Sequence, residues 1–168
     1  LEEHCRSFAH SRFDFKSISM ERVMNLRSLV ALYRYISKVS PDIIHTHSSI
    51  DSWLGGIVGK TSGIPVIRTR HVSLPVKDFF PNHLLYSYIP ERILTSGGMV
   101  ADVVKRVRCV NPDKVVSISA GVDLYKFNAE ISGEKIRKEL KVKSDQTLVG
   151  KIGVIRGWKG HNYFLEAI

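Results

Sequence analysis

The chain of 168 residues has little cysteine: Cys5 and Cys109 lie far apart and form no CxxC pair. This excludes a disulfide framework and a cysteine-rich zinc site, and it fits a reducing compartment. No apolar run approaches the ~18 residues of a membrane-spanning helix, and the chain starts at Leu1 without a signal peptide. We therefore expect a piece of a longer protein without a transmembrane segment.

Several ligand-binding signatures are also absent. The sequence contains neither GxxxxGK[ST] nor GxGxxG, which excludes a Walker loop and a dinucleotide fingerprint. No RNP, zinc-finger or basic-zipper motif occurs, so no nucleic-acid partner is predicted. Acidic residues are scarce, with 16 Asp and Glu against 25 Lys and Arg and a formal charge of +9. This balance favours an anionic substrate or membrane surface, although a merely basic domain would show it too.

What the chain does contain is an alternation of strand-like and helix-like apolar segments. Helical spacing occurs at residues 20–39, 51–61 and 98–108, and short strands are predicted at 43–47, 65–70, 92–96 and 114–118. Residues 72–90 predict an ordered loop with one short helix, and residues 12–18 alternate like a short strand. The order predicts an α/β fold, a Rossmann-like parallel sheet with helices on both faces.

The C-terminal part predicts the start of a second domain. Residues 148–155 read as a buried strand and residues from 162 onward as a helix. Between them Arg156, Gly157 and Lys159 form a basic loop, which suits a diphosphate, although a solvated basic turn is the alternative. We expect one domain over 1–125, a connector with a short helix over 126–145, and the start of a second Rossmann-like domain over 146–168.

Polar residues follow the predicted strands. Ligands of open parallel sheets bind at the carboxyl ends of the strands. The candidate site there comprises His47, Ser48, Ser49, Asp51, His71, Ser96 and Gly121.

Each candidate also has a plainer interpretation. His71 suits a proton acceptor or a hydrogen bond to a substrate hydroxyl, or it packs locally in a loop. Asp51 either contacts substrate or complements the dipole of the following helix. His45 and His47 form either a metal-binding pair or a structural pair, and we predict no metal because no third ligand has suitable spacing.

The order of these motifs resembles that of the group 1 glycosyltransferases, family 4, which have the GT-B fold. The resemblance covers about residues 40–168 and lies in the order and spacing of its parts rather than in any one motif. These parts are residues 41–49, 64–71, 94–96, 113–123, 149–153 and 159–161.

The resemblance implies two Rossmann-like domains that face each other across a cleft and transfer a sugar from a nucleotide-diphosphate sugar to an acceptor hydroxyl. It implies no metal and no cofactor beyond that co-substrate. It places Lys159, helped by Arg156, on the donor diphosphate and His71 in the cleft near the transferred sugar. Residues 46–53 resemble a subgroup of bacterial lipopolysaccharide or other envelope glycan synthesis. We therefore expect a glycan or lipid-linked acceptor and a cytoplasmic protein with peripheral contact to the anionic inner membrane face.

The chain departs from the family pattern at Gly153-Val154, where the family often has Gly-Arg. It also lacks the family's N-terminal Gly-rich loop and its second acidic motif, so we expect a fragment that is inactive alone. Two alternatives remain: a nucleotide-sugar epimerase of GT-B-like fold, and a non-catalytic basic Rossmann-like module that binds anions.

Overall fold

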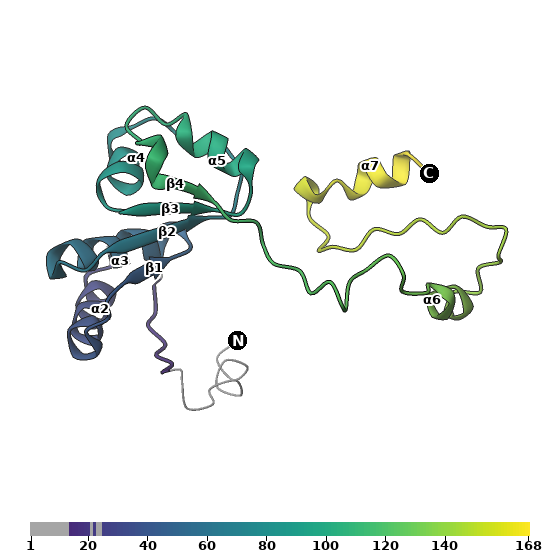
Figure 1. Cartoon of the computed structure of the whole chain (residues 1–168), viewed down its shortest axis with the longest axis horizontal. Helices are drawn as coiled ribbons and strands as arrows, with labels where there is room; N and C mark the ends of the chain where they lie inside the picture. The colour runs from purple at the N-terminus through teal and green to yellow at the C-terminus, as the bar shows by residue number, and fades with distance from the viewer. Residues whose placement is uncertain (1–13, 21, 23–24) are drawn as a thin grey trace. The chain divides into compact units, whose positions relative to one another are not determined.

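A computed structural model describes residues 14–20, 22 and 25–168. By its internal contacts the chain divides into two units, residues 1–121 and 122–168. The first unit contains a sheet of four parallel strands in the order β1-β2-β3-β4 (Figure 1). The strands are β1 (Ile44–Thr46), β2 (Val66–Arg70), β3 (Arg92–Thr95) and β4 (Val115–Ser117).

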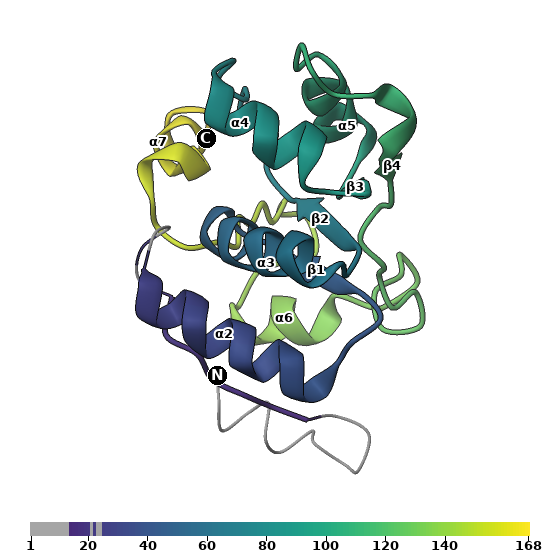
Figure 2. The ribbon, with the colours of Figure 1, turned by 90° about the vertical axis from the view of Figure 1, so that its left-hand side faces the viewer.

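Helical segments connect these strands, as parallel pairing requires. Those of the first unit are α2 (Leu26–Val39), α3 (Ser49–Ser62), α4 (Phe80–His83), the π-helix η1 (Leu84–Tyr88), α5 (Gly98–Lys105) and the 3-10 turn η2 (Pro112–Lys114). Helix α3 packs on β1 and β2, and α5 packs on β3 and β4. Helix α2 lies along α3 (Figure 2). The predicted fold class, a parallel α/β sheet flanked by helices, is confirmed.

The sequence sets the ends of the long helices. The side chain of Asn25 accepts hydrogen bonds at the start of α2, and that helix ends at Ser40 in the left-handed region (φ 48°). The predicted helix over 20–39 therefore begins later than expected, and its residues 21, 23 and 24 lie outside the described residues. Ser48 and Asp51 form a capping box at the start of α3, and Gly63 closes it with φ 68°, as its position predicted.

The core forms where the helices meet the sheet. It includes Ile44, Val66, Ile93 and Val115, one from each strand. In β1 and β3 buried residues alternate with less buried ones, and in β4 the side chain of Val116 is 39% exposed.

Helix α3 approaches its neighbours closely through three glycines: Gly55 and Gly59 face the sheet, and Gly56 faces Ile89 at the end of η1. A Cβ added at Gly59 would lie 2.3 Å from Val66 Cγ2, and one at Gly56 would lie 2.5 Å from Ile89 Cγ2. Neither position has room for a larger side chain unless its neighbour moves.

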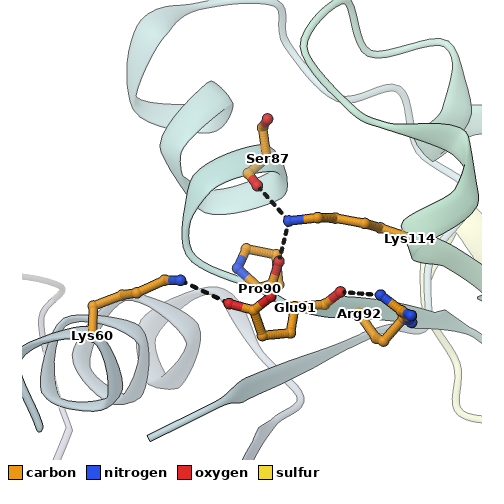
Figure 3. Close-up of polar contacts among 6 residues, drawn as sticks. All are labelled: Lys60, Ser87, Pro90, Glu91, Arg92 and Lys114. Carbon is orange, nitrogen blue, oxygen red and sulfur yellow. Dashed lines mark hydrogen bonds and ion pairs between the residues drawn. The ribbon is translucent and has the colours of Figure 1, made fainter. Parts of the chain in front are cut away.

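Polar contacts around η1 link α3 to the residue before β3, and link the last residue of η2 to η1 and Pro90 (Figure 3). Lys114 Nζ donates to the carbonyl oxygens of Ser87 at 3.4 Å and Pro90 at 3.2 Å. Lys60 Nζ pairs with Glu91 Oε1 at 2.9 Å. The lysine hydrogen bond, followed by the lysine charge, lowers the pKa of Glu91.

The second unit contains α6 (Glu134–Glu139), the 3-10 turn η3 (Gly157–Lys159) and α7 (His161–Glu166). The predicted short helix within 134–140 and the helix near 162 are thus present. The predicted buried strand over 148–155 is wrong, because these residues are extended but unpaired and exposed. A strand needs a hydrogen-bonding neighbour and a covered face, and the described part of this unit supplies neither.

Two further expectations can be compared with the structure. Residues 14–18 form no strand, and residues 12 and 13 of that prediction lie outside the described residues. Among the described residues no helix is both long and apolar enough to cross a membrane. The predicted domain limits at 125/126 and 145/146 stay predictions.

Candidate active site

The carboxyl ends of β1, β2 and β3 bring three of the predicted residues together. His47 follows β1, His71 follows β2 and Ser96 follows β3. His47 Nδ1 lies 3.1 Å from His71 Nε2, within hydrogen-bond distance. Ser96 Oγ donates to the carbonyl oxygen of His71 at 3.4 Å, and the Ser96 amide donates to the carbonyl oxygen of Arg70 at 3.3 Å. Three loops are thus cross-linked at one edge of the sheet.

Asp51 fixes the first of these loops. Its Oδ2 accepts from the amide of His47 at 2.8 Å, and its Oδ1 accepts from the amide and the hydroxyl of Ser48 at 2.6 and 2.8 Å. Both carboxylate oxygens are therefore used to start α3, which supports the capping interpretation of Asp51. Ser49 is the exposed first residue of the helix.

The three imidazoles of the site form a row. The rings of His45 and His47 have centroids 4.3 Å apart, and those of His47 and His71 have nearly parallel planes, at 12°, with centroids 5.4 Å apart. His45 Nε2 lies 2.6 Å from Thr69 Oγ1. Burial lowers the pKa of His45, and the neighbouring imidazoles lower it further. A positive charge on His45 is therefore disfavoured at this position in the row.

The expectation that this row binds no metal stays a prediction. In the described part of the chain no three His, Cys, Asp or Glu side chains form a group that could hold an ion. The His45–His47 pair is instead part of the ring stack.

Behind the edge lies a buried basic cluster that sequence reasoning missed. Arg68, 4% exposed, donates from Nη2 to the hydroxyl oxygen of Tyr86 at 3.1 Å and stacks on its ring. Arg70 donates to the same oxygen and to the carbonyl oxygen of Leu74. Burial lowers the pKa of the Arg68 guanidinium. The only sequence signal was the alternation of Arg68 and Arg70 in a buried strand, which places both on one face.

Gly121 stands apart from these residues. It is exposed, lies beyond the end of β4 at Ser117, and a Cβ built on it would meet no atom within 4 Å.

The predicted donor loop lies in the second unit. Arg156 precedes the turn η3, and Gly157 and Lys159 are its first and last residues; all three are exposed. Gly160 ends the turn with φ 66°, a conformation that favours glycine.

Two residues outside the predicted set hold this loop. Lys151 Nζ donates to the carbonyl oxygen of Gly160 at 2.8 Å, and His161 Nε2 lies 2.9 Å from the carbonyl oxygen of Val154. Since the carbonyl oxygen accepts, the Nε2 of His161 carries the proton.

Comparison with known proteins gives a consistent result. Residues 4–126 match the family Glycosyltransferase Family 4. The chain is 28% identical over 155 residues to UDP-Gal:alpha-D-GlcNAc-diphosphoundecaprenol alpha-1,3-galactosyltransferase of Escherichia coli, covering 86% of this chain and 40% of that protein. It is 24% identical over 142 residues to D-inositol 3-phosphate glycosyltransferase of Actinosynnema mirum, covering 75% and 33%. The chain thus spans about two fifths or less of these relatives.

Solved structures share the fold. A glycosyltransferase from Rickettsia africae matches with a TM-score of 0.68 at 21% identity, over 92% of this chain and 42% of that one. The Anabaena protein HepE in complex with UDP-glucose matches with a TM-score of 0.70 at 15% identity, over 90% and 43%.

Proposed function

The chain belongs to glycosyltransferase family 4. We therefore propose that it is part of a transferase that moves a sugar from a nucleotide-diphosphate sugar to an acceptor hydroxyl. The observation that carries this proposal is the contact of His47, His71 and Ser96 at the carboxyl edge of a parallel sheet within the matched region. Ligands of such sheets bind at that edge. His71 is assigned to the reacting sugar, and His47, Ser48, Ser49, Asp51, Ser96 and Gly121 to the acceptor side.

The donor diphosphate is assigned to the loop at Arg156, Gly157 and Lys159. In glycosyl transfer the bond from C1 to the diphosphate breaks as the acceptor oxygen attacks C1, and negative charge grows on the leaving group. Two exposed cations beside a glycine can meet that charge, with Arg as a fork and Lys as a point charge. By resemblance to the family, transfer is proposed to need neither a metal nor another cofactor.

The names of relatives suggest the substrates. One relative uses UDP-galactose and a diphosphoundecaprenol-linked acceptor, and a structural neighbour holds UDP-glucose. We therefore propose a UDP-hexose donor and a lipid-linked glycan acceptor, in lipopolysaccharide or other envelope glycan synthesis.

A lipid-linked acceptor would place the protein on the cytoplasmic face of the inner membrane. The formal charge of +9 supports a peripheral contact with anionic lipid. Vesicles of phosphatidylglycerol should sediment the chain at low salt and release it at high salt, whereas phosphatidylcholine vesicles should not sediment it. Equal binding to both vesicles would refute the electrostatic contact.

The test of the activity uses the complete gene product with a panel of nucleotide sugars and lipid-linked acceptors. Release of nucleoside diphosphate should depend on the acceptor and persist in EDTA. Lys159→Ala should lower turnover by ~10²-fold or more, because the leaving group loses a cation. Lys135→Ala, which removes an exposed lysine of α6, is the matched control and should leave turnover unchanged. Wild-type turnover in the Lys159 variant would remove this loop from the site.

The same assay separates the alternatives. An epimerase would convert the nucleotide sugar without any acceptor, and a non-catalytic module would release no nucleotide. The relatives named above are transferases, which favours the transferase.

A further inference from the structure

The side chains of His47 and His71 come from neighbouring loops and meet through their ring nitrogens. His47 Nδ1 and His71 Nε2 are 3.1 Å apart, and the two ring planes differ by 12°. We propose that His47 is a positioning residue, which holds His71 as its Nε2–H tautomer so that His71 Nδ1 accepts a hydrogen bond from a substrate hydroxyl. The identity of that substrate rests on the proposed function, whereas the tautomer does not.

A hydrogen bond between two ring nitrogens holds one hydrogen. If His71 Nε2 carries it, His71 Nδ1 is an acceptor; if His47 Nδ1 carries it, His71 Nδ1 must be a donor while His71 stays neutral. In the first arrangement both rings are Nε2–H tautomers, the form that a neutral histidine side chain prefers. In the second, His47 must adopt the less favoured tautomer. The first arrangement is therefore the more stable, and His47 decides what His71 presents.

His47 is well placed for this role because it is held from two sides. Its amide donates to Asp51 Oδ2 at 2.8 Å, and its ring packs at 4.3 Å against that of His45. His45 is in turn within 2.6 Å of Thr69 Oγ1 on the adjacent strand. The acceptor nitrogen of His47 is therefore fixed relative to β2, where His71 begins its loop.

The backbone of His71 is fixed separately. Its carbonyl oxygen accepts from Ser96 Oγ at 3.4 Å, and Ser96 also donates its amide to the preceding residue, Arg70. These bonds hold the main chain, but they leave the rotation of the imidazole to side-chain contacts. The ring-to-ring hydrogen bond supplies the missing constraint, and so His47 and Ser96 restrain different parts of His71.

Within the row of rings, His45 favours its neutral form. Burial lowers the pKa of His45, and the charges of His47 and His71 lower it further. A neutral row is a condition of the proposal, because an imidazolium carries hydrogen on both nitrogens and has no tautomer to select.

The first test reads the tautomer directly in this chain by ¹⁵N–¹H correlation of the histidine rings at neutral pH. The His71 signals are assigned by their loss in His71→Gln. We expect the Nε2–H form in the wild type. It should persist in His47→Asn, whose Oδ1 can replace Nδ1 as acceptor, and give way to a mixture in His47→Leu. An Nδ1–H form in the wild type, or an unchanged tautomer in His47→Leu, would overturn the proposal.

The second test measures transfer by the complete gene product. His47→Leu should lower kcat by roughly 10-fold, about 1.4 kcal/mol, the upper end for one hydrogen bond between exposed groups, with little change in the donor KM. His47→Asn should recover most of that loss. The matched control is His83→Gln. His83 is the last residue of α4 and pairs with Asp78, outside the site, so this variant should behave as wild type.

The outcomes of the second test are distinct. The positioning role would be overturned by a wild-type kcat in His47→Leu. It would also be overturned if His47→Asn and His47→Leu lost kcat equally while both kept a native circular dichroism spectrum. A wild-type protein without transfer to any acceptor would sink the proposed function instead, and the tautomer measurement would still decide the role of His47.

Discussion

Replacing Gly59 with alanine tests how closely α3 lies on the sheet. The added Cβ would lie 2.3 Å from Val66 Cγ2, 3.1 Å from the carbonyl oxygen of Ile64 and 3.4 Å from Ile44 Cδ1. Val66 is fully buried and belongs to the central strand β2, so neither it nor the backbone oxygen can easily move. An overpacked core position costs about 1–3 kcal/mol.

The helix itself would gain from the same substitution. Alanine is favoured over glycine inside a helix by about 1 kcal/mol. Gly59 therefore tests two opposing effects, and because the first contact is far below the van der Waals distance, overpacking should win. With an overpacking cost in the upper part of its range, about 2–3 kcal/mol, less about 1 kcal/mol gained by the helix, we expect a net destabilisation of about 1–2 kcal/mol. Gly56→Ala should cost less, because the nearest atoms around it all belong to the side chain of Ile89, whereas Gly59 also faces a backbone oxygen.

Gly98→Ala supplies the matched control. Gly98 is the first residue of α5, and a Cβ there would meet no atom within 4 Å. Urea unfolding followed by circular dichroism at 222 nm should show a lower midpoint for Gly59→Ala, by roughly 1 M for an m-value of 1–3 kcal/mol/M. Gly98→Ala should unfold at or slightly above the wild-type midpoint. A wild-type midpoint in Gly59→Ala, or an equal loss in both variants, would refute the close approach of α3.

Three further predictions concern buried or paired polar groups. Tyr86→Phe removes the oxygen that accepts from two arginines, and the unpaired buried donors should cost about 1–3 kcal/mol in urea unfolding; an unchanged midpoint would show that Arg68 finds another partner. Lys114→Met frees two backbone carbonyl oxygens and should cost about 1 kcal/mol in the same assay, while Lys105→Met, at an exposed lysine, should cost nothing measurable. The Lys60–Glu91 pair lowers the pKa of Glu91, so its contribution is complete above the ordinary value of 4.5 and is lost as pH falls through the lowered pKa. Since both side chains are partly exposed, Glu91→Gln should cost less than about 1 kcal/mol at pH 7, and the cost should shrink as the pH falls below 4.5; a cost that does not change with pH would contradict the ion pair.

The sheet could be predicted from the sequence because its signals are local. Valine and isoleucine fill residues 43–44, 66–67 and 115–116, and Gly63 with Pro65 marks the end of α3. Parallel pairing then follows from the alternation with helices, and the meeting of His47 with His71 at one edge follows from parallel pairing.

Other features depend on contacts that a local pattern does not contain. The segment 148–155 has the composition of a buried strand, but in the described residues it has no neighbouring strand to pair with. Composition alone therefore predicted a strand that does not form. The Arg68–Tyr86 contact joins residues 18 apart, from β2 and from the π-helix η1, and no local pattern pairs them. The site was therefore predicted as a set of positions, whereas its hydrogen bonds were not.

The double use of Asp51 has a consequence for local unfolding. One carboxylate both starts α3 and holds the amide of His47, so the first helical turn cannot fray without releasing the loop that carries this histidine. The amide protons of His47, Ser48 and the first turn should exchange with solvent as one cooperative unit. A variant or a solvent that unfolds the first turn of α3 should therefore also disorder the row of imidazoles. On warming, the helix start and the histidine row should lose order over the same temperature range.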